Sequence, residues 1–468
     1  MYVVSKEKLL FDLYYAFQCA KKHKSNKEYV KVFESDLHNN LVVLRDEIYE
    51  RRYKPQPSIC FIITDPKRRE IFAANFRDRI VHHLYYNYTY DLFDKTFIED
   101  SYSCRKGKGT HYGIKRLERH IRQESENYTK KTYALKMDIK GYFIHINRIL
   151  LLSIVNNTLD KMMYRKVPNS KLKYCDTIDF DLVKYLNREI IMLNPIKNCI
   201  IRSKRSEWYL LDKSKSLFYS DDNCGLPIGN LTSQLFSNVY LNVLDQYMKR
   251  VLHCRHYGRY VDDFYVVSTD IEFLKNVISS VSKFMNEELN LEIQPKKTVI
   301  IDIKCGVEFL GGFIKPYRTY LSNKTIKRMN RRLYEFQKYG TDKNVCDVVN
   351  SYLGMFSHYR SNKVKKAIMD KTSKITDYGY FIGYYSKFIP FMLPYEYTKH
   401  STPCCGTPYI QYQLLKTATI RCYSQSACKP YRTYRGNDRK TFLPLYSNDT
   451  SARQCNAVRS PYLHSGKY

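Results

Sequence analysis

Apolar residues recur at helical spacing through residues 1–55, and this periodicity predicts helices that pack by one face. The recurring positions are Leu9, Leu10, Leu13, Tyr14 and Phe17, followed by Leu37, Leu41, Leu44, Ile48 and Tyr49. Spacings of three and four residues are typical of amphipathic helices whose apolar stripe faces a core. We therefore expect a helical layer in this part of the chain.

The pattern changes after residue 131. Residues 133–139 form a short β-prone run that ends near an acid, and residues 231–251 have the apolar period of a long helix. An aromatic hairpin at 257–268 and a helix across 271–288 follow, and residues 321–380 return to a helical, Lys- and Arg-rich character. This order predicts an α+β core in which helices cover one face of an antiparallel sheet.

Two adjacent acids, Asp262 and Asp263, stand inside the aromatic stretch 257–268. Ionised carboxylates are costly to bury unless a cation compensates their charge. Mg²⁺ suits such a pair, because it takes few protein carboxylates and leaves its other positions to water and phosphates. The pair therefore indicates phosphoryl or nucleotidyl transfer.

Two-metal nucleotidyl transfer requires carboxylates from separate strands. Asp138 at the end of a predicted strand and Asp262 at a predicted hairpin tip meet this requirement. Asp263 is either a third ligand or a positioning acid. We expect these side chains to hold two Mg²⁺ ions, with Mn²⁺ as an alternative.

The chain is strongly basic, with 78 Lys and Arg against 46 Asp and Glu and a formal net charge of +32. Such an excess favours a polyanionic partner, and 45 Tyr favour a nucleic acid with accessible bases. Basic clusters within 65–70, 77–79 and 103–111 favour a phosphate-contacting surface. A membrane-surface protein is the weaker alternative, since no amphipathic basic helix stands out.

The length of 468 residues predicts two or three subdomains. No apolar run approaches the roughly 20 residues of a membrane span, and no signal-peptide core is evident near Met1, so we expect a cytoplasmic protein without a membrane partner. In that compartment the 14 Cys are expected to be free thiols. Zinc binding by the C-terminal cysteines is the alternative, but their spacing matches no C-x2-C pair. These candidates are Cys404, Cys405, Cys422, Cys428 and Cys455, with His400 or His464.

Five blocks, in order between about residues 60 and 320, resemble the motifs of reverse transcriptases. They are Met137–Phe143, Gly225–Gln234, Tyr260–Asp263, Gln294–Thr298 and Gly306–Gly311. The resemblance implies an α+β right-hand polymerase with fingers, palm and thumb. Its reaction would be the extension of a DNA or RNA primer by dNTPs on an RNA template.

The resemblance also implies roles for the acids and one lysine. Asp138 and Asp262 would be metal ligands, with Asp263 beside them and the Ile139 carbonyl as a further oxygen. Lys297 would act as the general acid near the leaving pyrophosphate, since an ammonium can neutralise and protonate it.

Other residues would contact the nucleotide, the primer or the template. Phe143 would lie under the incoming sugar and exclude a 2′-hydroxyl, with an ordinary core aromatic as the alternative. Lys67, Arg69 and Arg105 would bind the triphosphate or the template from the fingers. The remaining positions are Ile228, Gly229, Ser233 and Gln234 at the nucleotide, and Tyr260, Phe309, Leu310 and Gly311 at the primer and template.

The second block departs from the common pattern of the family. Most reverse transcriptases have Gln and Pro where this chain has Ile228 and Gln234. The variant resembles diversity-generating retroelement enzymes, which misincorporate opposite template adenines. A branched apolar side chain cannot make the hydrogen bonds of an amide, so the geometry of the base pair is enforced less strictly. A small basic accessory protein would then be a partner.

Two alternatives remain open. One is an anti-phage defence enzyme that copies a non-coding RNA, and the other is a catalytically idle RNA-binding protein with the same fold. The resemblance divides the chain into an N-terminal helical extension at 1–55, fingers at 56–130, a palm at 131–320 with a fingers insertion near 150–222, a thumb at 321–380 and a basic Tyr- and Cys-rich extension at 381–468.

Overall fold

The computed structural model describes residues 2–64, 67–339, 345–359, 362–370 and 373–391. All of them fall within one compact unit, which spans residues 1–391. The cysteines and histidines considered as zinc ligands lie outside the described residues.

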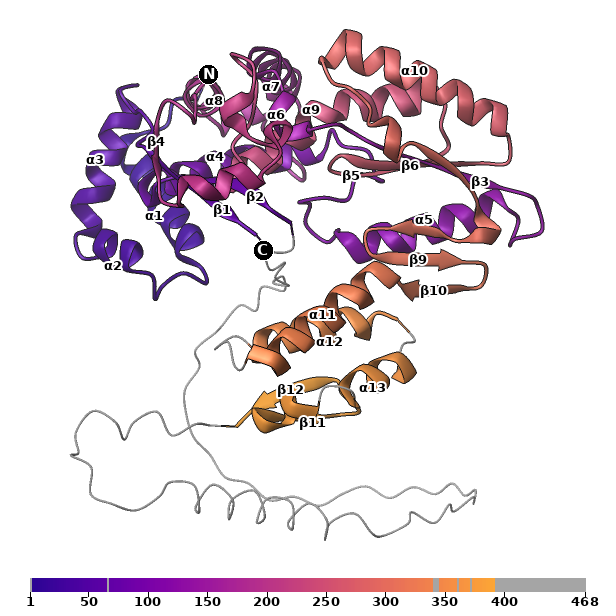
Figure 1. Cartoon of the computed structure of the whole chain (residues 1–468). Coiled ribbons are helices and arrows are strands. Elements are labelled where there is room, and N and C mark those ends of the chain that lie inside the picture. The colour runs from indigo at the N-terminus through magenta and orange to yellow at the C-terminus, as the bar shows by residue number, and fades with distance from the viewer. Residues whose placement is uncertain (1, 65–66, 340–344, 360–361, 371–372, 392–468) are drawn as a thin grey trace, which may run out of the picture. The chain divides into compact units, whose positions relative to one another are not determined.

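Helices and short strands alternate along this unit (Figure 1). The α-helices are α1 Lys6–Lys21, α2 Glu28–Glu34, α3 Leu37–Tyr49, α4 Phe76–Asp94, α5 Thr110–Glu124, α6 Tyr142–His145, α7 Arg148–Met163, α8 Phe180–Ile191, α9 Leu231–Arg250, α10 Ile271–Leu289, α11 Asn323–Tyr339, α12 Val345–Ser357 and α13 Asn362–Asp370. The strands are β1 Ser58–Ile63, β2 Arg69–Ala73, β3 Tyr133–Asp138, β4 Cys199–Ile201, β5 His256–Tyr260, β6 Asp263–Ser268, β7 Val299–Asp302, β8 Val307–Phe309, β9 Gly312–Lys315, β10 Arg318–Leu321, β11 Gly379–Ile382 and β12 Lys387–Pro390.

The palm sheet has the strand order β5-β6-β3-β7, with antiparallel pairing throughout. Side chains on neighbouring strand positions alternate between two cores, as the period of a strand requires. Phe264 and Val266 pack with α9 and α10, whereas Tyr265 and Val267 pack with α5. Helices therefore cover both faces of this sheet, with α10 and α5 on opposite sides (Figure 1). The expectation that only one face is covered was wrong, because the apolar side of α5 packs on the second face of the sheet.

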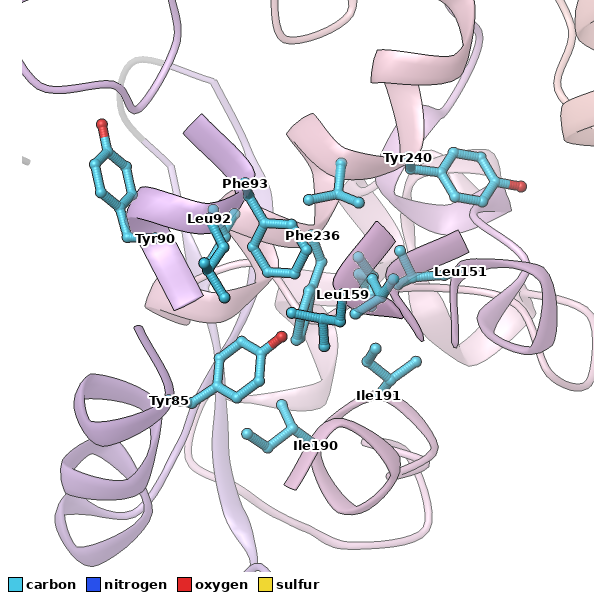
Figure 2. Packing of buried hydrophobic residues seen from close by; sticks show 14 of the residues in the cluster. Tyr85, Tyr90, Leu92, Phe93, Leu151, Leu159, Ile190, Ile191, Phe236 and Tyr240 are labelled. Carbon is cyan, nitrogen blue, oxygen red and sulfur yellow. The ribbon is translucent and has the colours of Figure 1, made fainter. Parts of the chain in front are cut away.

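The largest core joins the N-terminal helices to the palm. Figure 2 shows its centre, where side chains from α4, α7, α8 and α9 converge. Tyr85 on α4 packs against Phe236 on α9 with ring centroids 5.3 Å apart. The predicted helices at 231–251 and 271–288 are confirmed by α9 and α10, and the helical character of 1–55 by α1 to α3.

A second sheet has the order β2-β1-β4. β1 and β2 are antiparallel neighbours, whereas β4 joins β1 in parallel with Ser58 opposite Cys199. This third strand comes from the predicted insertion near 150–222, so the insertion completes the sheet of the fingers.

A separate core holds the helices that follow the palm, α11, α12 and α13. Phe388 on β12 is buried in it, and Phe388 N donates to Asn350 on α12 at 2.7 Å. Residues 381–391 therefore belong with these helices, not with the extension predicted to begin at 381. Among the described residues, no helix is both long and apolar enough to cross a membrane.

A buried ion pair fastens β5 to α9. Arg259 and Asp245 have no exposed side-chain surface, and the guanidinium donates to both carboxylate oxygens at 2.7 and 2.6 Å. Tyr257 O–H donates to the same carboxylate at 2.6 Å. Removal of one partner from such a pair leaves a buried charge without compensation.

We therefore expect Asp245→Asn to lower the free energy of unfolding by about 3–5 kcal/mol, because Arg259 would remain buried and charged. Urea unfolding followed by circular dichroism measures this change. The control is Glu272→Gln, which removes an exposed pair with Lys275 and is expected to leave the unfolding midpoint in place. An Asp245→Asn variant as stable as the wild type would contradict the prediction.

Candidate active site

The turn between β5 and β6 carries the paired acids. Tyr260 pairs with Asp263, so Val261 and Asp262 form the turn itself. Val261 has φ +53°, a left-handed conformation that is strained for a β-branched residue and costs about 1–3 kcal/mol. Its backbone is held on both sides, since Val261 N donates to Ser103 Oγ at 3.2 Å and Val261 O accepts from Arg259 at 3.1 Å.

The structure brings Asp138 to this turn. Asp138 lies opposite Asp263 in the β3–β6 ladder, and Ile139 N donates to the Asp262 carbonyl at 3.2 Å. Residues directly opposite each other in an antiparallel pair have Cα atoms about 4.5–5.5 Å apart. Three acids from two distant parts of the chain therefore meet at one end of the two central strands of the palm sheet, β3 and β6.

The carboxylates affect one another electrostatically. Burial raises the pKa of Asp262, and the negative charge of Asp138 raises it further. Burial also raises the pKa of Asp263 to about 6, although the positive charge of Lys136 opposes this. Such half-buried like charges are stabilised by a bound cation.

The donor set fits Mg²⁺ in part. Asp138, Asp262 and the Ile139 carbonyl offer only oxygen atoms, which magnesium prefers. No group of three or more His, Cys, Asp or Glu among the described residues forms a ready metal cluster. Mg²⁺ commonly takes one or two protein carboxylates and completes its shell with water and substrate phosphates.

Lys297 lies against the acids. It follows Pro295 in a 3-10 turn (Pro295–Lys297), and its ammonium donates to both Asp138 oxygens at 2.7 and 2.8 Å. The side chain is 57% exposed, so the ammonium faces the open side of the site. This places a proton donor beside the carboxylate predicted to bind metal.

Cations from the fingers reach the same region. Burial lowers the pKa of Lys67, and the like charges of Lys324, Lys297 and Arg69 lower it further, whereas Asp138 raises it. Arg69 also lowers the pKa of Asp262, although burial dominates there. Lys67 and Arg69 therefore lie within electrostatic range of the acids.

Arg105 does not reach the site. Its nearly buried guanidinium bonds to the Asp94 carboxylate at 2.7 Å and to the carbonyls of Ile98 and Ser101 at 2.6 and 3.0 Å. These bonds close the loop that precedes α5. The predicted phosphate contact of Arg105 is thus replaced by a structural role.

The second block lies against β2. Phe72 N donates to Ile228 O at 3.0 Å, and a Cβ on Gly229 would meet Ile71 at 2.9 Å, so only glycine fits this approach. Ile228 is half-buried and Gly229 is exposed. Gln234 is half-buried in the first turn of α9.

Ser233 turns inward instead. Its residue is 4% exposed and lines an interior cavity of about 20 Å³ together with Asp78 and His82. It does not face the open site as a nucleotide-binding residue. Phe143 is half-buried beside Tyr142, with ring centroids 5.3 Å apart, and also packs against the main core, so its aromatic ring serves the core in part.

The predicted primer contacts divide into two kinds. Phe309 is fully buried and packs edge-on against Tyr265, so it is a core residue and not a primer contact. Leu310 and Gly311 form the turn between β8 and β9, with φ values of +51° and +83°. Tyr260 is half-buried at the end of β5, next to the paired acids.

Sequence reasoning missed residues that hold the site in place. Arg259 and Asp245 support the turn, and Lys136 faces Asp263 from β3. Arg259 could have been found, because a cation inside the apolar run 256–268 needs a buried partner. Asp245 lacks such a signal, since a helical acid is usually solvated.

Comparisons with known proteins agree with this geometry. Residues 179–314 match the family described as reverse transcriptase (RNA-dependent DNA polymerase). Protein YkfC of Escherichia coli (strain K12) is 21% identical over 308 residues, which cover 58% of this chain and 70% of that protein.

Two solved telomerase structures are also similar. Apo telomerase from Candida tropicalis, truncated from its C-terminal domain, has 14% identity and a TM-score of 0.42 over 57% of this chain and 55% of that one. Telomerase from Candida albicans with a TWJ fragment of telomeric RNA has 12% identity and a TM-score of 0.40 over 69% and 60%. The chain thus spans little more than half the length of these telomerases.

The palm topology and the family match define the α+β fold of a right-hand polymerase, as predicted. Within that class, the chain contains a reverse transcriptase domain. The family match begins at residue 179 and does not include Asp138. The place of Asp138 at the site therefore rests on its pairing with Asp263 in the β3–β6 ladder.

His82 gives this region a measurable pH response. Its Nδ1 lies 2.5 Å from Thr232 Oγ1 in the second block, and burial lowers the pKa of His82 to about 3. The folded pKa lies below the unfolded value of about 6.5. The contribution of His82 to the free energy of unfolding is therefore fully present above pH 6.5 and is lost as the pH falls toward 3. The slope is roughly 1.4 kcal/mol per pH unit for this group.

We expect His82→Gln to flatten the dependence of unfolding free energy on pH between 6.5 and 4, as measured by urea unfolding at several pH values. His38 is exposed, so His38→Gln serves as the control and should retain the wild-type slope. Identical slopes for the wild type and His82→Gln would refute the assignment.

Proposed function

We propose that this protein is an RNA-directed DNA polymerase that extends a DNA or RNA primer on an RNA template with dNTPs. The single observation that supports this most is the meeting of Asp138 with the Asp262–Asp263 turn at one end of the central strands β3 and β6. The reverse transcriptase domain supplies the reaction class, and the charge of +32 suits the polyanionic template and primer.

The residues of this site divide the work by chemistry. Asp138, Asp262 and the Ile139 carbonyl would hold two Mg²⁺ ions, which activate the primer 3′-hydroxyl and stabilise the leaving pyrophosphate when bound. Lys297 would hold a proton beside the leaving group. Lys67 and Arg69 would bind the triphosphate from the fingers.

Asp263 would act mainly as a positioning acid. Asp263 on β6 pairs with Asp138 on β3. Lys136, two residues before Asp138 on β3, lies on the same face of the sheet. Lys136 offsets part of the negative charge of Asp263, whose pKa burial still raises to about 6.

The second block supports a finer proposal, namely low fidelity opposite template adenines. Ile228 is half-buried and its carbonyl accepts from Phe72 N on β2, which supports a fixed backbone at this position. The substituted positions Ile228 and Gln234 favour a diversity-generating retroelement role over defence by copying a non-coding RNA. A small basic accessory protein would be its partner.

Primer extension with a defined RNA template tests the activity. We expect Asp262→Asn to lower the rate by about a thousandfold or more, since an amide cannot replace a charged metal ligand. Glu288→Gln, an isosteric change at an exposed position on α10, should keep the wild-type rate. Equal activity of the wild type and Asp262→Asn, or an inactive wild type, would favour an idle RNA-binding protein.

Sequencing of the cDNA product tests the finer proposal. We expect wild-type errors to concentrate at template adenines, and Ile228→Gln to reduce them several-fold by restoring an amide at this position. Leu226→Ile, a volume-conserving change in the same block, should keep the wild-type error pattern. Uniform fidelity across the four template bases would remove the argument based on Ile228.

A further inference from the structure

Glu70 on β2 is a buried carboxylate with three directed bonds. The residue is 3% exposed, and its oxygens accept from Trp208 Nε1 at 2.6 Å, Ser216 Oγ at 2.8 Å and Leu217 N at 2.7 Å. In the part of the chain that the structure describes, Glu70 has no salt bridge to a cation. A carboxylate held only by hydrogen bonds from one segment fixes the position of that segment.

The bonded residues lie in the stretch 202–219, which we call the tryptophan segment. It packs on one face of the β1–β2 hairpin, in a small core with Cys60, Phe72 and Ile144. A second bond joins the same strand region to it, since Arg68 donates to Glu207 O at 3.2 Å. The segment is therefore attached to the fingers at several points.

The tryptophan segment also reaches the loops around Phe143. A Cβ on Gly141 would come within 3.3 Å of Ser214 O, and one on Gly225 would meet Leu217 at 2.4 Å. Leu226 N donates to Phe143 O at 2.7 Å. The segment that Glu70 holds therefore contacts Gly141, two residues before Phe143, and Gly225, which precedes the residue bonded to Phe143 O.

Successive side chains of β2 point to opposite faces of the strand, and this alternation relates the Glu70 bonds to the position of Arg69. Glu70 points into the small core, whereas Arg69 is exposed on the opposite side of the strand. Any movement of β2 relative to the tryptophan segment changes the position of Arg69. A buried carboxylate is a costly way to add stability alone, but its directional bonds fix geometry well.

We propose that Glu70 is a positioning residue that sets Arg69 and the Phe143 loop around the triphosphate and sugar of an incoming dNTP. This inference rests on the proposed function. It predicts that loss of the Glu70 bonds weakens nucleotide binding more than it slows the chemical step, because the metal-binding acids on β3 and the β5–β6 turn remain in place.

Trp208 provides a direct reporter, because it is the one tryptophan of the chain. In Glu70→Gln, the amide NH₂ would face the Leu217 N–H, so one of the three bonds cannot form. We expect the Trp208 emission to shift to longer wavelength in this variant. We also expect the KM for dNTP to rise about five- to tenfold, with kcat changed by less than about twofold.

Two further variants keep the test sound. Trp208→Phe removes a single donor and should raise the KM for dNTP in the same direction but less. Lys204→Gln changes an exposed side chain in the same segment and should keep wild-type KM, kcat and emission. Equilibrium binding of Mg²⁺–dNTP to each variant is measured in parallel.

The outcomes separate the two proposals. Wild-type KM in Glu70→Gln together with a shifted emission would make Glu70 merely structural and overturn the positioning role. A fall in kcat of about five- to tenfold, with an unchanged KM for dNTP, would also overturn the positioning role. If the wild-type protein neither extends a primer nor binds Mg²⁺–dNTP, the proposed function itself fails, and the positioning role with it.

Discussion

Arg259 and Asp245 form the contact on which the geometry of the site depends. The pair fastens β5 to α9, and the same guanidinium donates to Val261 O inside the turn that carries Asp262. A left-handed valine would relax if this turn were free, so the strain persists only because its surroundings hold it. The position of the acids is thus set by a charge pair deep in the protein.

The site brings acidic side chains together with lysine ammonium groups. The acids lie at one end of the central palm strands β3 and β6, where burial raises the pKa of Asp262 and of Asp263. Lys297 on the palm and Lys67 from the fingers stand around them. Carboxylates with raised pKa values beside ammonium groups are suited to exchange protein charge for metal and phosphate charge on substrate binding.

Much of this arrangement could be predicted from the sequence. Strong apolar periodicity predicted α9 and α10, and acids in apolar surroundings predicted that Asp138 and Asp262 meet. Both signals are local in the sequence. Arg105, Ser233 and Phe309 were misplaced, since whether such a side chain faces a site or the interior depends on elements far away in the chain. The bonds of Glu70 to residues more than 130 positions later carry no local signal at all.

The parallel pairing of β1 with β4 has a consequence for synthesis on the ribosome. Ser58 can pair only after Cys199 has been synthesised. About 140 further residues are therefore translated before the sheet of the fingers acquires its last strand. Until then the β1–β2 hairpin has an open edge, and exposed strand edges promote aggregation in nascent chains. We therefore expect that slowing elongation across this interval would expose that edge for longer and lower the yield of folded protein.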